Sequence, residues 1–147
     1  MASSARILLN TRTLPAKSEI LLVDDDPTVL FVVKECLRHS GQFDVSEFAH
    51  PVDALAAFEK EPHRYSMLIT DYCMPEMTGE DLACQIHEQR PEIPVIGISG
   101  TPHKYRHPEI FAELLPKPFD MAALEATVER LLVPVVPPPG SQPEARI

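Results

Sequence analysis

The sequence lacks a long apolar run, a surplus of basic residues and an even number of cysteines. No apolar stretch approaches the roughly 20 residues that a helix needs to cross a bilayer, so we predict no membrane partner. Thirteen basic residues are outnumbered by 22 acidic ones, and the formal net charge of −9 argues against direct nucleic-acid binding. The three cysteines, Cys36, Cys73 and Cys84, have no metal-site spacing. Because Cys36 and Cys84 fall within helical patterns, we interpret them as small core residues in a reducing compartment, and we expect a cytoplasmic protein.

Acidic residues are missing from the first 18 positions, and proline is concentrated after position 133. The leader 1–18 carries three basic residues and no acid before Glu19. Organelle transit peptides can have this composition, but a flexible N-terminal leader is the simpler interpretation. The Pro-rich segment 134–147 favours an extended, disordered tail. The remaining residues, 19–133, have the length of one domain with a single core.

Between these ends, strand and helix patterns alternate. Short apolar runs bounded by turn residues predict strands at 20–23, 66–70, 93–98 and, more briefly, 114–115. Alternation of apolar and polar residues predicts a further strand at 43–48. Helical periodicity predicts helices at 27–40, 51–61, 79–89 and 120–132. In the second helix, the pattern places Val52, Leu55 and Ala56 toward the core. Repeated strand–helix units with continuous apolar strands are typical of an α/β, doubly wound fold with a parallel sheet covered on both faces.

Two of the predicted strands end in carboxylates. Asp71 ends one apolar run, and Asp24, Asp25 and Asp26 follow the first strand. Ligands bind at the carboxyl ends of parallel strands, so we expect these acids to lie near one another. Two carboxylates about 4 Å apart repel by roughly 4 kcal/mol at an effective dielectric near 20, so either one stays protonated or a hard divalent ion lies among them. Oxygen-only donors suit Mg²⁺, whereas Asp26 is expected to cap the next helix.

Two further strand ends provide a hydroxyl and an ammonium group. Ser99 and Gly100 follow the fourth strand, and Lys117 follows the fifth. Pro118 disfavours a helical conformation at Lys117, and an X-Pro bond is cis in only about 5–6% of cases. Acids, a divalent ion, a hydroxyl, a backbone amide and one ammonium are the parts of a phosphoryl-transfer site. In such a site a carboxylate can attack phosphorus while cations neutralise the equatorial oxygens.

With these groups in this order, the chain resembles the receiver domain of two-component response regulators over about residues 19–133. The resemblance rests on four separately placed motifs: Val23-Asp24-Asp25, then Asp71 with Met74, Pro75 and Gly79, then Ser99-Gly100, then Lys117-Pro118-Phe119. It implies a flavodoxin-like, five-stranded parallel sheet in the order 2-1-3-4-5, which periodicity alone does not supply.

The resemblance also implies a function. Asp71 would accept a phosphoryl group from a sensor histidine kinase or phosphotransfer protein, and the protein would then change its binding to a downstream protein partner. Its only catalysis would assist its own phosphorylation and dephosphorylation, so it would be a signalling receiver rather than an enzyme.

The family's site residues carry over onto matching positions. Asp25 and Asp71 would bind Mg²⁺ directly together with the Cys73 backbone carbonyl, and Asp24 would act largely through water. Around the phosphoryl group, one ammonium, one hydroxyl and two backbone amides would donate: Lys117, Ser99, Tyr72 and Gly100.

Two features depart from the family pattern. The stretch between the fourth and fifth strands is a few residues shorter than usual and is interrupted by prolines, so we expect a shortened or irregular fourth helix with one turn starting at Pro108. Leu114 stands three residues before Lys117, where many receivers carry a Tyr or Phe that moves with the switch hydroxyl. Tyr105 and Phe111 lie nearby in the sequence, which assigns neither of them a switching role.

Two other functions remain open. Asp24 and Asp26, separated by one residue after an apolar strand, match the nucleophile motif of haloacid dehalogenase-type phosphatases. Such enzymes need a further acidic pair on a strand end after the lysine, and the acids beyond Lys117 fall on a helix or tail. A phosphorylation-independent interaction module of receiver shape is the second alternative, which the intact acids, Ser99 and Lys117 disfavour.

Overall fold

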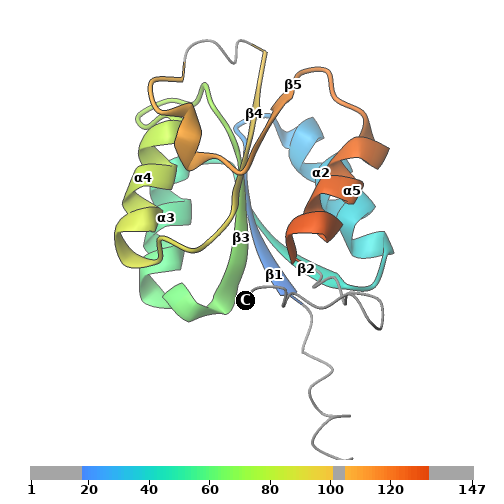
Figure 1. The fold of residues 1–147 in the computed structure, drawn as a ribbon, viewed down its shortest axis with the longest axis horizontal. Helices are drawn as coiled ribbons and strands as arrows, with labels where there is room; N and C mark the ends of the chain where they lie inside the picture. Colours follow the sequence, from blue (N-terminus) through green and yellow to red (C-terminus); the bar gives the residue numbers. More distant parts are fainter. Residues whose placement is uncertain (1–17, 101–104, 133–147) are drawn as a thin grey trace, which may run out of the picture.

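The computed structural model describes residues 18–100 and 105–132, which form a parallel sheet with helices on both faces (Figure 1). The strands are β1 (Ser18–Val23), β2 (Phe43–Phe48), β3 (Tyr65–Asp71), β4 (Val95–Ser99) and β5 (Glu113–Pro116). Their spatial order, β2-β1-β3-β4-β5, confirms the expected topology. In the register of this sheet Val23 of β1 pairs with Thr70 of β3, so the two acid-bearing strand ends are neighbours.

Four helices cover the sheet in the described part of the chain: α2 (Pro27–His39), α3 (Pro51–Lys60), α4 (Gly79–Gln89) and α5 (Met121–Leu132). Figure 1 shows α3 and α4 together on one face of the sheet and α2 and α5 on the other. Two short 3-10 turns, η1 (Pro62–Arg64) and η3 (Pro108–Ile110), complete the described elements. The chain is therefore doubly wound, as the alternation of patterns predicts.

The central strands are buried on both faces. In β1, Leu21 and Val23 belong to the core cluster beneath α3 and α4, whereas Ile20 and Leu22 belong to the cluster beneath α2 and α5. Each of the four side chains is at most 1% exposed. Full burial of such a side chain stabilises the fold by about 1.5–3 kcal/mol, which explains why the strand is apolar at every position instead of at alternate ones.

The ends of α2 follow from local sequence. The Asp26 side chain accepts a hydrogen bond from the Thr28 amide at 2.9 Å, and Pro27 occupies the first turn. After the helix, Gly41 has a φ of 80°, the left-handed conformation that favours glycine and ends helices. The predicted N-cap is therefore confirmed, and Gly41 explains where the helix ends.

The predicted inward face of α3 is wrong. Val52 and Ala56 are exposed and Leu55 is only partly buried, whereas Ala54 and Phe58 are fully buried. Phe58 carries the largest apolar side chain of this helix and packs into the core cluster, so its position sets which face turns inward. A short helix with apolar residues on several sides does not reveal this phase by periodicity alone.

The cysteine interpretation also needs correction. Cys36 and Cys84 are partly buried instead of core residues, and Cys73 is exposed. Their sequence neighbours Leu37 and Ala83 take the inward positions of α2 and α4, which leaves the cysteines at the edges of the buried faces.

Strand β1 begins at Ser18, the last residue of the predicted leader. The rest of the leader, the tail 134–147 and residues 101–104 lie outside the described residues. No helix in the described ranges is long and apolar enough to span a membrane.

Between β4 and β5, the described residues 105–112 contain one 3-10 turn and no longer helix. This turn, η3, begins at Pro108, where the sequence predicts it. Phe111 and Leu114 lie over Gly97 of β4, where an added Cβ atom would come within 2.9 Å of both side chains. Glycine at this position therefore lets two apolar side chains, instead of a full helix, hold this segment on the sheet.

Candidate functional site

Four strand ends bring the predicted site residues to one edge of the sheet. Asp24 follows β1, Asp71 ends β3, Ser99 ends β4 and Lys117 follows β5. Backbone hydrogen bonds extend the sheet past these ends: the Asp24 amide donates to the Phe48 carbonyl at 3.1 Å, and the Lys117 amide donates to the Ser99 carbonyl at 3.0 Å. The parallel ladder itself thus fixes the relative positions of the chemical groups.

Three carboxylates form a compact oxygen cluster. One oxygen atom from each of Asp24, Asp25 and Asp71 lies within 4.8 Å of the others. Asp24 is 1% exposed and Asp71 6%, while Asp25 faces solvent. An all-oxygen set of this size with one open side fits Mg²⁺, which takes one or two carboxylates and keeps several waters. The donor chemistry therefore matches the cation that the sequence suggests.

Lys117 bridges the two buried acids. Its amine lies 3.2 Å from an Asp71 oxygen and 3.3 Å from an Asp24 oxygen. The Lys117–Pro118 peptide bond is cis. The Asp26 amide donates to the second Asp24 oxygen at 2.8 Å, so this carboxylate is hydrogen-bonded on both sides.

Burial dominates the electrostatics of the acids. It raises the pKa of Asp24 to about 6, against the lowering effects of the Asp26 amide and of Lys117. Burial also raises the pKa of Asp71, partly offset by Lys117 and by the Tyr72 amide. For Lys117, burial lowers the pKa, but the two carboxylates outweigh burial and the net shift is upward. The site therefore holds more negative charge than one lysine neutralises, which favours uptake of a cation.

The loop after Asp71 is packed tightly against that residue. An added Cβ at Gly79 would lie 2.1 Å from the Asp71 backbone oxygen, so only glycine fits there. The Gly79 amide donates to the Tyr72 carbonyl at 2.9 Å. Thr78 caps α4 in a reciprocal capping box with Asp81, which fixes where the loop ends and the helix begins.

The other predicted site residues lie nearby in different settings. Ser99 is buried at the end of β4, and Gly100 is exposed with open space around its α-carbon. The Tyr72 amide donates to the Ile98 carbonyl at 3.0 Å, as part of the extended ladder. Cys73 lies on the exposed loop beyond it.

Sequence reasoning misses Glu80. The sequence analysis assigns this residue no role, yet its side chain is fully buried and accepts hydrogen bonds from the Arg106 amide at 3.0 Å and from the His107 amide. These partners lie about 26 residues further along the chain, so no local signal reveals the contact. Glu80 anchors the segment 105–107 to α4.

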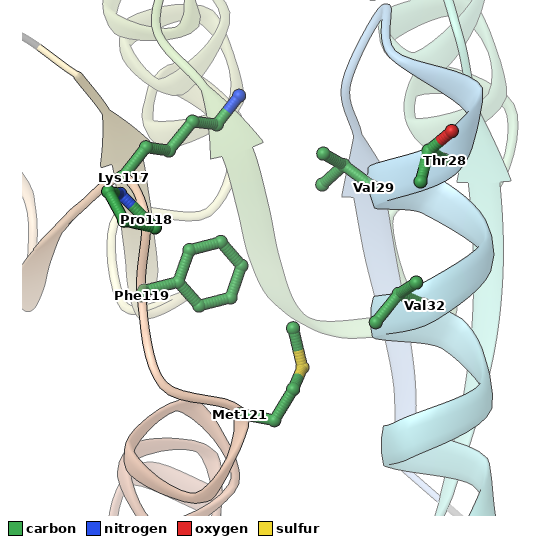
Figure 2. Close-up of a pocket in the computed structure, with 7 residues that line it drawn as sticks. All are labelled: Thr28, Val29, Val32, Lys117, Pro118, Phe119 and Met121. Atoms are coloured by element: carbon green, nitrogen blue, oxygen red, sulfur yellow. The ribbon is translucent and has the colours of Figure 1, made fainter.

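A separate apolar pocket opens beside the site. It has a volume of about 450 Å³ and lies between the start of α2 and the β5–α5 connection (Figure 2). In Figure 2 the Phe119 ring and Met121 face Val29 and Val32 across this space, with Lys117 extending past its rim. Because no carboxylate of the acid cluster lines the pocket, it is distinct from the cation position.

Comparison with known proteins agrees with the geometry. The family model of the response regulator receiver domain matches residues 20–129. Sensor protein EvgS of Escherichia coli is 38% identical over 88 residues, which are 60% of this chain but 7% of EvgS, so the chain spans a small part of that relative. The response regulator receiver protein CpdR of Brucella abortus is 30% identical over 118 residues, 78% of this chain and 96% of CpdR. Among solved structures, the response regulator protein TrrA from Thermotoga maritima, in complex with Mg(2+)-BeF, has a TM-score of 0.71 at 26% identity and covers 78% of this chain and 99% of its own.

Proposed function

Since this chain belongs to the response regulator receiver family, we propose that it accepts a phosphoryl group on Asp71 and thereby changes its binding to a protein partner. Receiver domains are signalling modules that interact with histidine kinases and downstream effectors. The donor proposed here is a phosphohistidine of a sensor histidine kinase or phosphotransfer protein. The observation that carries the proposal is the contact of Lys117 with Asp71 beside the three-acid cluster.

The transfer itself requires one nucleophile. An Asp71 carboxylate oxygen attacks phosphorus, a new P–O bond forms, and the P–N bond to the donor imidazole breaks. The imidazole nitrogen keeps the electron pair of that bond. Asp71 must be ionised to attack, and the nearby Lys117 amine favours the ionised form.

Charge on the transferred group is neutralised by residues already in place. Lys117, 3.2 Å from Asp71, pairs with a phosphoryl oxygen, and Ser99 and the amides of Tyr72 and Gly100 are the proposed hydrogen-bond donors. Asp24, Asp25, Asp71 and the Cys73 carbonyl would hold Mg²⁺, which supplies further positive charge to the oxygens when bound.

Phosphorylation adds about −1.5 to −2 charge and three acceptor oxygens to an already acidic site. Lys117 and Ser99 must turn toward the new group, and both sit at the start of loops that leave the sheet edge. A local electrostatic change is in this way passed to the surface loops, which is how a receiver alters its affinity for a partner.

The haloacid dehalogenase alternative requires the Asp26 carboxylate to take part in the reaction. Asp26 instead caps α2 through its contact with the Thr28 amide and is not a member of the acid cluster. The cap role explains this acid without catalysis. The structure of the described residues offers no specific observation in favour of a phosphorylation-independent module.

Phosphorylation by acetyl phosphate with Mg²⁺ tests the proposal. The wild-type protein should gain one phosphoryl group by intact-protein mass spectrometry, and Asp71→Asn should gain none. Asp26→Ser keeps a capping oxygen and removes the carboxylate, so it should still be labelled at the wild-type rate. Labelling of Asp71→Asn at the wild-type level would refute the assignment, and loss of labelling in Asp26→Ser would favour the phosphatase.

A further inference from the structure

The phenol of Tyr105 is a buried polar group to which the proposed function gives no role. The residue is 8% exposed, and its hydroxyl oxygen forms no hydrogen bond of standard geometry among the described residues. Buried hydroxyl groups are nearly always hydrogen-bonded, because leaving one unpaired is unfavourable. An unpaired phenol next to a site that receives a phosphoryl group therefore needs an explanation.

Aromatic contacts hold this ring between two parts of the site. It packs edge-on against Tyr72, with ring centroids 4.7 Å apart, and against Phe111 at 4.6 Å. Tyr72 directly follows Asp71, and Phe111 lies over Gly97 of β4. Such T-shaped pairs favour one orientation of the ring, so the phenol is positioned and not merely enclosed.

The phenol lies close enough to Asp71 and Ser99 for both side chains to affect its ionisation. Burial raises the pKa of Tyr105, the Asp71 carboxylate raises it further, and hydrogen bonding to the Ser99 side chain lowers it. The hydroxyl thus keeps its proton and is available as a donor on the side of Asp71 and Ser99. Leu114, three residues before Lys117, has no hydrogen-bonding side chain to compete for this role.

The backbone next to Tyr105 is tied to α4. The amides of Arg106 and His107 donate to the buried Glu80 carboxylate, and the Arg106 guanidinium lies 3.4 Å from Asp81. A displacement of the Tyr105 ring would therefore pull on contacts at the N-terminal end of α4. The exposed residues 106–109 would carry that displacement to the surface.

We propose that the Tyr105 phenol donates a hydrogen bond to the phosphoryl group on Asp71 and so couples phosphorylation to the segment 105–111. This inference rests on the proposed function, because the acceptor exists only once Asp71 is modified. Phosphorylation supplies acceptor oxygens to a phenol that lacks a hydrogen bond of standard geometry in the unmodified protein. The segment 105–111 then responds through the Tyr105 side chain.

Binding of beryllofluoride with saturating Mg²⁺ to the full-length chain tests this role, followed by fluorine NMR of the bound group. Tyr105→Phe removes only the hydroxyl and should weaken beryllofluoride binding roughly tenfold or more, and it should shift one bound fluorine resonance. Tyr65→Phe, at the other end of β3, removes a phenol from a similarly buried ring and should change neither quantity. In the wild type, the ring-carbon resonances of Tyr105 should move when beryllofluoride is added, which needs no substitution at all.

Unchanged affinity and fluorine spectrum in Tyr105→Phe, while the wild type binds normally, would overturn the role of Tyr105 and leave the proposed function intact. Static Tyr105 resonances in the saturated wild type would overturn it too, whatever the stability of the variant. If the wild type shows no bound fluorine signal, the proposed function fails and this inference fails with it.

Discussion

At the scale of single residues, the site depends on one lysine placed between two buried acids. Lys117 lies within 3.3 Å of both Asp24 and Asp71, yet the pKa of Asp24 still rises to about 6. Burial thus outweighs the attraction of the amine, as expected when a carboxylate is almost completely removed from water. Without a bound cation, ionisation of Asp24 is therefore unfavourable, and binding of a cation or a phosphoryl group nearby would change its pKa.

The raised pKa of Asp24 predicts a pH-dependent stability in EDTA. The folded protein releases this proton at about pH 6 and the unfolded chain at its ordinary value of 3.8. The stabilisation is therefore complete below pH 3.8 and is lost as the pH rises through 6, by at most about 3 kcal/mol. Asp24→Asn, which keeps an acceptor for the Asp26 amide, should be more stable than the wild type by about 1–2 kcal/mol at pH 7.5, with no advantage near pH 4.

Thermal unfolding of both proteins at the two pH values measures this difference. Asp26→Asn is the matched control, because it removes an exposed acid and keeps the N-cap, so its pH dependence should follow the wild type. A wild type that stays more stable than Asp24→Asn at pH 7.5 in EDTA would show that the Lys117 contact outweighs burial.

At the scale of elements, the sequence predicts the groups at the strand ends better than the packing around them. Apolar runs that end near Asp71, Ser99 and Lys117 locate the site edge, because parallel pairing places the carboxyl ends of all strands at the same edge of the sheet. The inward face of α3 is predicted wrongly, since Phe58 alone selects it in the folded core. The contact between Glu80 and the 106–107 backbone joins distant segments, so it depends on tertiary packing that no local pattern contains.

At the junction of β3 and α4, Gly79 occupies a position where we expect only glycine to be tolerated. Gly79→Ala would place a Cβ 2.1 Å from the Asp71 backbone oxygen, and backbone cannot rotate away as a side chain can. We expect it to lower the free energy of unfolding by about 2–3 kcal/mol and to slow phosphorylation of the displaced Asp71. Gly100→Ala is the control, because an added Cβ there meets no atom of the described residues within 4 Å. Chemical denaturation should place Gly100→Ala within about 0.5 kcal/mol of the wild type, and an equal loss in both variants would contradict the steric argument.

At the scale of the whole molecule, charge and site are linked. The chain carries a formal net charge of −9, and three of its carboxylates meet within 4.8 Å at one edge of the sheet. Any divalent cation will reduce the general self-repulsion of such a chain. A cation held by the cluster adds a larger, saturable effect, because it binds the folded state and not the unfolded one.

Magnesium should therefore stabilise the protein through the cluster and only weakly through overall charge. At a Mg²⁺ concentration a hundred times its dissociation constant, the free energy of unfolding should rise by about 2.7 kcal/mol, which corresponds to roughly 10 °C in Tm. Asp25→Asn should lose most of this gain and cost little stability in EDTA, because Asp25 is exposed. Glu59→Gln removes one acid that is also exposed, on α3 and outside the cluster, and should keep the full gain. Melting curves in Mg²⁺, compared with melting curves in NaCl at matched ionic strength, separate the two effects. General screening depends on total charge, so it would give Asp25→Asn and Glu59→Gln the same gain in stability, and that result would contradict a bound cation.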